Sequence, residues 1–176
     1  SARMWAGAII ILNIVLLLSC APPEPIRLGY IGGASGRVAD LGIAGRDAVL
    51  LAVELRNQAG GVAGRKVELL IRDDEQKPEV AQRAVRELIK QGVVAIIGPM
   101  TSAMAIAIAP IADEAAIVLI SPTVVANELT GKDDYFLRRS LPMQQYVRKM
   151  ALYQRHARGL RRVTAVYDLN NRAYTE

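Results

Sequence analysis

Short apolar runs alternate with longer amphipathic stretches along most of this chain. Apolar runs cover 26–31, 67–71, 93–97 and 117–120, and the stretch 40–58 between the first two spaces its apolar and charged residues as a helix does. This alternation is typical of βαβ units around a parallel sheet. Because strands so short and apolar are buried on both faces, helices should cover both sides of the sheet. The sequence therefore predicts an α/β fold with a doubly wound parallel sheet, and ligands at the carboxyl ends of its strands.

Five further elements complete this prediction. Pro78 is typical of the first turn of a helix, and Gly92 marks a helix end. The additional helices are expected over 78–91, 101–115 and 143–155, and the additional strands over 135–138 and 163–167.

Composition argues against several classes of function. The net charge is +5, but the basic residues are scattered except for one late cluster, and the aromatic residues, 5% of the chain, do not interleave with it. That cluster consists of Arg155, His156, Arg158, Arg161 and Arg162. It is more typical of a solvated face, so no nucleic-acid partner is expected. The single cysteine excludes an internal disulfide framework and a cysteine-cluster metal site.

The start of the chain is typical of an export signal. The residues from 4 to 19 carry no charge and are mostly aliphatic, yet they fall short of the roughly 20 residues that span a bilayer. The sequence Leu17-Leu18-Ser19-Cys20 resembles the lipobox of bacterial lipoproteins, in which the cysteine becomes the lipidated first residue. We therefore predict an export signal over 1–19, lipidation of Cys20 and a proline-rich tether over 20–25. The alternative is an uncleaved anchor helix that ends at this cysteine.

Polar residues follow the first two predicted strands. The turn 32–36 is rich in glycine and leads into a helix, so its backbone N–H groups could meet an anion. The acidic group 72–75 could hold a metal or accept a phosphoryl group, but a polar loop before the helix at Pro78 is the favoured interpretation. Neither segment is specific by itself.

The next two strands are followed by hydroxyl groups. Thr101 and Ser102 stand where a helix begins, so one of them could cap that helix or hold a carboxylate beside the free N–H groups. The loop 121–130 offers backbone polar groups at the same edge. Both segments belong to the predicted ligand crevice.

Catalysis lacks a candidate set of residues. His156 is the sole histidine and has no acidic residue close by in sequence to orient it. The turn 32–36 superficially resembles the nucleotide turn of short-chain dehydrogenases, but Val38 replaces the expected third glycine and no Tyr-x-x-x-Lys pair occurs. A nucleotide-dependent oxidoreductase is thus a weak alternative, and no enzyme activity, cofactor or metal is expected.

Taken together, these segments resemble the branched-chain amino-acid-binding family of periplasmic binding proteins, which also includes ligand-binding domains of receptors and sensors. The resemblance covers 26 to about 168, and its order and spacing are more specific than any single motif. The matching stretches are Gly36 through Asp47, Asn57 to Val62 with Gly64, Asp73-Asp74 before Pro78, Ile97-Gly98-Pro99, and Ile120-Ser121-Pro122 with Glu128-Leu129-Thr130.

The resemblance implies two doubly wound lobes that close like a hinge on a small molecule. The first lobe would cover 26–141, and 142–176 would be the start of an incomplete, truncated second lobe. The implied function is non-enzymatic capture of an amino acid or related carboxylate outside the cytoplasmic membrane, for delivery to an ABC permease. The alternative within the family is a sensor or receptor module that reports to a signalling partner.

The resemblance also implies the ligand site. Ser102 matches the hydroxyl that holds the α-carboxylate of an amino acid, and Thr123 matches a position of backbone contacts. Leu41 stands where an aromatic residue is common and Val125 where a ligand-binding threonine is common, while Tyr174 corresponds to a pocket tyrosine of the second lobe. The candidate ligand-binding residues are Leu41, Thr101, Ser102, Thr123, Val125 and Tyr174.

Overall fold

The computed structural model describes residues 23–167, 169 and 172–175. Five strands form one all-parallel sheet in the order β2-β1-β3-β4-β5. The strands are β1 (Ile26–Ile31), β2 (Val67–Arg72), β3 (Ala95–Ile97), β4 (Val118–Ser121) and β5 (Phe136–Arg138). The predicted doubly wound parallel sheet is confirmed. The predicted export signal and the lipid site at Cys20 lie outside the described residues.

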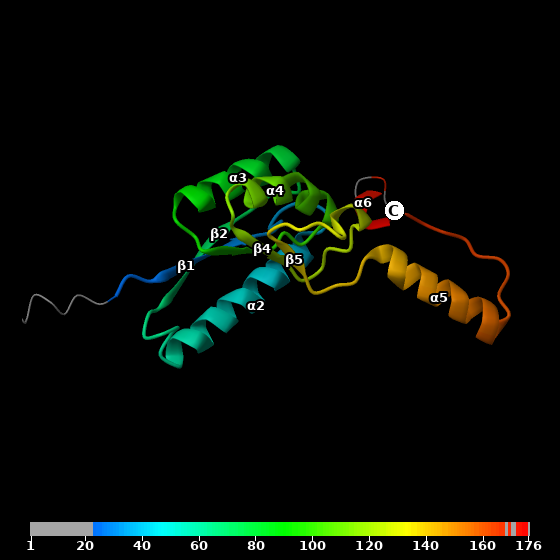
Figure 1. Cartoon of the computed structure of the whole chain (residues 1–176), viewed down its shortest axis with the longest axis horizontal. Coiled ribbons are helices and arrows are strands. Elements are labelled where there is room, and N and C mark those ends of the chain that lie inside the picture. Colours follow the sequence, from blue (N-terminus) through cyan, green and yellow to red (C-terminus); the bar gives the residue numbers. More distant parts are fainter. Residues whose placement is uncertain (1–22, 168, 170–171, 176) are drawn as a thin grey trace, which may run out of the picture.

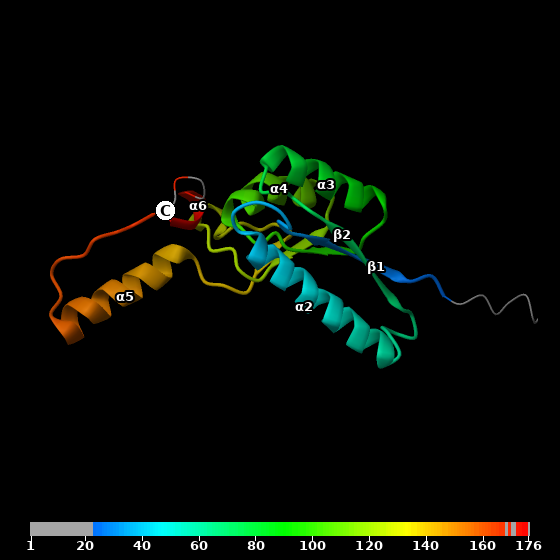
Figure 2. The ribbon, with the colours of Figure 1, turned by 180° about the vertical axis from the view of Figure 1, so that it is seen from behind.

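Helices cover both faces of the sheet, as predicted. In Figures 1 and 2, α3 and α4 lie together on one side of the sheet and α2 lies on the other. The helices are α2 (Ala39–Gln58), α3 (Pro78–Lys90), α4 (Ser102–Glu114), α5 (Met143–Arg158) and α6 (Arg172–Thr175), with a 3-10 turn η1 (Asn127–Leu129). In the sheet order, β2 lies on one side of β1, and β3, β4 and β5 follow on the other side. The direction of the chain connections therefore reverses between β1 and β3, where doubly wound sheets bind ligands.

The densest core lies between the sheet and the α3–α4 layer. Successive strand residues point to opposite faces, and on this face Ile31, Ile96 and Leu119 are fully buried. Leu88 of α3 packs against them, close to the position of Gly29 in β1. The parallel strands are thereby fixed relative to one another, which also fixes the loops at their carboxyl ends.

On the opposite face of the sheet, α2 is hydrogen-bonded to β1 near the turn that follows β1. The Tyr30 hydroxyl donates a hydrogen bond of 2.5 Å to the Gly42 carbonyl, and burial, followed by the negative charge of Asp74, raises the pKa of Tyr30 to about 12. A Cβ atom at position 42 would lie 1.9 Å from the Gly33 carbonyl oxygen. Glycine at position 42 therefore allows α2 to approach the turn that follows β1.

One predicted element is wrong. The stretch 163–167 is not a strand, and Val163 and Val166 are 88% and 95% exposed. A strand needs a neighbour to accept and donate its backbone hydrogen bonds, and no described strand pairs with this stretch.

Helix α5 stands apart from the sheet (Figures 1 and 2), and none of its residues is buried. It continues to Arg158, three residues beyond the predicted end, and stops where Gly159 adopts a left-handed conformation with φ of 69°. Among the helices of the described part, none has the length and apolar character needed to cross a membrane.

The core predicts a large effect for truncation of Leu88. The Leu88→Ala substitution should lower the free energy of unfolding by about 2–5 kcal/mol, because it leaves a cavity between α3 and the sheet. Denaturant unfolding followed by circular dichroism measures the change. Val94→Ala is the matched control, because Val94 is 57% exposed, and it should cost far less. Equal losses in both variants would contradict the core described above.

Candidate functional site

A pocket of about 920 Å³ lies at the carboxyl edge of the sheet. Its walls come from the segments that follow β1, β3, β4 and β5, and from the stretch near the end of the chain. Five of the six predicted ligand-binding residues line this one pocket, although they are spread along the sequence. These five residues are Leu41, Thr101, Thr123, Val125 and Tyr174. The edge is the one where doubly wound sheets bind ligands.

The sixth predicted residue, Ser102, lies beneath this group. Its side chain is 1% exposed, and its Oγ accepts a hydrogen bond of 3.3 Å from the backbone N–H of Val125. Thr101 is the residue that precedes the first turn of α4, but its side chain forms no capping bond. Of the two roles considered for these hydroxyls, capping of α4 by Thr101 is not observed. Thr101 lines the pocket.

Hydroxyl groups join the loops that follow β3 and β4. The Ser121 hydroxyl donates to the Pro99 carbonyl at 2.7 Å, and the Thr123 hydroxyl donates to the Met100 carbonyl at 2.6 Å. Ser121 also accepts a bond of 3.3 Å from the N–H of Val124. These loops therefore form one wall of the pocket. Ser121 is the last residue of β4, and this position at the carboxyl end of a strand is the signal that could have singled it out.

Two arginines at the end of β5 were missed by the sequence-based reasoning. Arg138 donates to the Ala126 carbonyl at 2.6 Å and to the Thr130 hydroxyl, and burial lowers its pKa. Arg139 lines the pocket, as does Arg37 after β1. Arg139 directly follows β5, and Arg37 lies in the segment between β1 and α2, so their positions could have indicated both residues. The direction of each side chain could not be read from sequence.

The glycine-rich turn after β1 meets an anion supplied by the chain itself. The Asp73 carboxylate accepts hydrogen bonds from the Ala34 N–H at 2.9 Å, the Ser35 hydroxyl at 3.0 Å and the Glu75 N–H at 2.8 Å. Burial acts to raise the pKa of Asp73, but these hydrogen bonds outweigh it and hold the pKa below its ordinary value. An external anion is therefore not needed by these groups of the turn.

The neighbouring Asp74 has the opposite environment. Its side chain is buried, and burial raises its pKa even though it accepts a bond of 2.8 Å from the Gln76 N–H. Among the described residues, no cluster of histidine, cysteine or acidic groups is arranged to hold a metal ion. The segment 72–75 thus acts as a polar loop that holds the glycine-rich turn, which is the interpretation favoured from the sequence.

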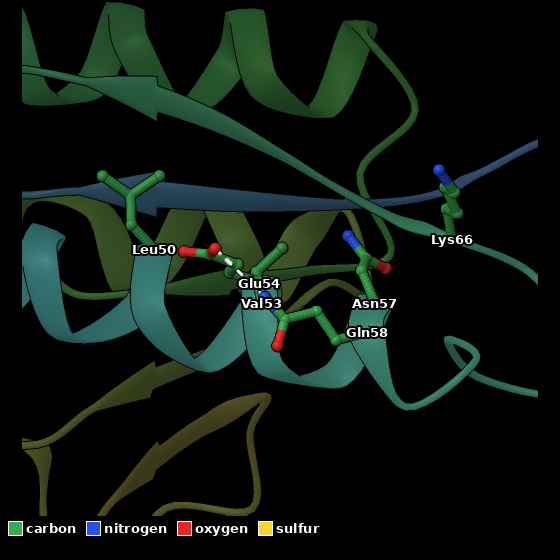
Figure 3. A pocket seen from close by; sticks show the side chains of 6 residues that line it. All are labelled: Leu50, Val53, Glu54, Asn57, Gln58 and Lys66. Carbon is green, nitrogen blue, oxygen red and sulfur yellow. Dashed lines mark hydrogen bonds between the residues drawn. The ribbon is translucent and has the colours of Figure 1, made fainter.

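A second pocket, of about 640 Å³, lies near the end of α2 and the start of β2 (Figure 3). Its polar groups serve the fold: Asn57 donates to the Val67 carbonyl at 2.8 Å and accepts from the Val67 N–H at 2.7 Å. Gln58 donates to Glu54 at 3.2 Å, the bond drawn in Figure 3. This pocket gathers none of the predicted ligand-binding residues, so the carboxyl edge is the stronger candidate.

Comparisons with known proteins agree with this architecture. A family profile described as periplasmic binding protein matches residues 25–174. The Leu/Ile/Val-binding protein BraC3 of Rhizobium johnstonii is 31% identical over 122 residues, which cover 68% of this chain and 33% of that protein. The chain spans about a third of the length of the curated relatives it matches.

Solved structures with bound ligands are also similar. An ABC transporter substrate-binding protein from Desulfitobacterium hafniense, in complex with Leu, is 27% identical with a TM-score of 0.71 over 87% of this chain and 45% of that one. A solute-binding protein of an ABC transporter from Rhodopseudomonas palustris, in complex with 3,4-dihydroxybenzoic acid, is 27% identical with a TM-score of 0.61. That match covers 69% of this chain and 33% of the other.

Removal of the Asp73 carboxylate should loosen the turn after β1. We expect Asp73→Ala to lower the free energy of unfolding at pH 7 by roughly 0.5–1.5 kcal/mol, because three donors lose their acceptor but remain accessible to water. The folded-state pKa is depressed, so this contribution is present above the ordinary pKa of 3.8 and is lost as the pH falls through the lower, folded-state value. Denaturant unfolding at pH 7 and near pH 2 measures both effects.

The control for this prediction is Asp133→Ala, which removes an exposed carboxylate from the loop before β5. It should leave the free energy of unfolding nearly unchanged at both pH values. If Asp73→Ala costs as much near pH 2 as at pH 7, the ionised carboxylate is not what holds the turn.

Proposed function

Because this chain belongs to the periplasmic binding protein family, we propose that it captures a small carboxylate-bearing solute, an amino acid or a related acid, outside the cytoplasmic membrane and delivers it to an ABC permease. The relatives are named as binding proteins and not as enzymes. The observation that carries the proposal is the convergence of Leu41, Thr101, Thr123 and Val125 on one pocket at the carboxyl edge of the sheet.

The amino terminus of α4 offers groups that can bind a carboxylate. The first N–H groups of a helix lack partners within the helix and carry a partial positive charge, which favours an anion. Thr101 lines the pocket at this helix start, and the buried Ser102, which carries the second hydroxyl, is the first residue of α4. In this proposal the ligand carboxylate binds between the α4 amino terminus and these two hydroxyls.

The ligands of the similar structures share one group. Leucine and 3,4-dihydroxybenzoic acid both carry a carboxyl group, and they differ in nearly everything else. This shared group supports a carboxylate as the common feature of recognition. The side chains that replace the usual aromatic and threonine, Leu41 and Val125, would then shape the remainder of the pocket.

We further propose that 26–141 form the first lobe and that 142–176 begin the second. In support, the sheet ends at Arg138, and α5 begins at Met143 with no buried residue. Several large apolar side chains of α5 are exposed, including Tyr146, Met150 and Tyr153, as expected for an element outside the first core. A hinge between the lobes would close over the pocket.

The lipobox-like sequence at 17–20 supports export and anchoring through Cys20. If Cys20 is lipidated, the Cys20→Ser variant should lose incorporation of a radiolabelled fatty acid in bacterial cells and should leave the membrane fraction. The chain with Cys20 intact should be labelled and sediment with membranes. Membrane association that persists in the serine variant without label would favour an uncleaved anchor helix.

Ligand capture is tested by thermal unfolding of the purified protein with a panel of amino acids and small carboxylates. A compound that binds the folded state should raise the unfolding midpoint in a concentration-dependent way. At a ligand concentration a hundred times the dissociation constant, the folded state should gain about 2.7 kcal/mol of stability. Ser102→Ala should abolish the shift produced by that compound.

Val85→Ala is the control, because Val85 is fully buried on α3 and does not line the pocket, so its truncation should lower stability without touching the ligand site. Both variants should lose stability, and only Ser102→Ala should lose the ligand-dependent shift. No shift with any compound, in a protein shown to be folded, would overturn capture of an amino acid or small carboxylate.

A further inference from the structure

The described lining residues of the pocket at the carboxyl edge include positively charged side chains and no acidic one. Two of its lining residues, Arg37 and Arg139, carry a positive charge, and none of its described lining residues is acidic. The acidic groups of the same edge are engaged elsewhere: Asp73 holds the glycine-rich turn, and Glu75 pairs with Lys77 at 2.8 Å. A solute in this pocket therefore meets the positive charge of Arg139, and no acidic side chain is among the described lining residues.

The backbone around Arg139 is held firmly. Its N–H donates a bond of 3.2 Å to the Ser121 carbonyl, and the hydroxyl of the next residue, Ser140, donates one of 3.0 Å to the Pro122 carbonyl. These bonds extend the pairing of β5 with β4 beyond the last strand residue. The arginine thus projects from a fixed position of the pocket wall.

The two consecutive arginines have different surroundings. Alternate residues of an extended segment point to opposite faces, and the Arg138 side chain is used to hold Ala126 and Thr130 in the loop after β4. The Arg139 side chain is exposed and lines the pocket. Within the described part of the chain, its guanidinium makes neither a hydrogen bond nor an ion pair, whereas Arg27, Arg46 and Arg72 are each paired with a carboxylate.

We propose that Arg139 makes this pocket selective for anionic solutes, so that a carboxylate without an ammonium group binds more tightly than the amino acid of the same carbon skeleton. The guanidinium fork can hold a carboxylate through two parallel hydrogen bonds, and it repels an ammonium group in the same pocket. This inference rests on the proposed function, because it assigns the charge class of the solute that the same site captures.

Matched ligand pairs test the proposal. Isothermal titration calorimetry compares leucine with 4-methylpentanoate, and phenylalanine with 3-phenylpropanoate, since each pair differs by the ammonium group alone. In each pair that binds, the acid without the ammonium group should bind about tenfold more tightly to the unaltered protein at low salt. The preference should narrow at high salt, because the arginine is exposed.

Variants then assign the preference to Arg139. Arg139→Gln should weaken binding of the acid by about tenfold and leave the amino acid within about twofold, while Arg139→Lys should keep part of the preference, because the charge stays and the fork is lost. Arg83→Gln is the control, since Arg83 is exposed on α3 and does not line the pocket. It removes the same charge and should change neither affinity. Circular dichroism melting of each variant confirms that it is folded.

The outcomes separate this inference from the proposed function. Tighter binding of the amino acids, or an equal loss of both ligands in Arg139→Gln, overturns selectivity by Arg139 and leaves capture of carboxylates intact. If the preference survives in Arg139→Gln, another group is responsible, and the inference is also wrong. Failure of all four compounds and of the wider panel to bind the folded protein overturns the proposed function and this inference with it.

Discussion

The hydrogen bonds between the loops after β3 and β4 are the interaction on which the pocket depends. Beyond the last paired strand residues the regular ladder ends, yet the backbone groups there are buried and need partners. The hydroxyls of Ser121 and Thr123 satisfy the carbonyls of Pro99 and Met100, and Ser102 accepts the N–H of Val125. Because α4 begins within this set of bonds, the start of the helix cannot move without breaking them. The pocket wall is thus pre-organised before any solute binds.

Acidic and basic side chains lie at opposite ends of the carboxyl edge of the sheet. At the β2 end the Asp73 carboxylate accepts hydrogen bonds from backbone donors, and the Asp74 side chain is buried. At the β5 end Arg138 is used within the fold, while Arg139 is presented to the pocket. The acidic groups are engaged within the fold and Arg139 is accessible, which is the basis of the proposed preference for a negative ligand. The fold determines this polarity through the directions of its side chains and not through the overall charge of the chain.

Much of the fold could be predicted because its signals are local. Apolar runs and helical spacing placed β1, β2, α2 and α3 within one or two residues of their observed bounds. The stretch 163–167 has an equally apolar pattern but is not a strand, because strand formation depends on a partner that sequence spacing cannot guarantee. Thr101 was considered as a possible cap from its place before α4, but its side chain forms no capping bond and the residue lines the pocket.

The sequence by itself determined the doubly wound sheet and the edge at which polar residues gather, because both follow from the order of apolar runs and from what lies after each of them. Only the tertiary structure decided how those residues are used. It placed Ser102 below the pocket and Thr101 within it, and it directed Arg138 to the loop and Arg139 to the pocket. The sequence pattern alone cannot distinguish the two members of either pair of neighbouring residues. They differ in the folded protein because adjacent side chains point in different directions, and because contacts from distant loops decide which of them remains accessible.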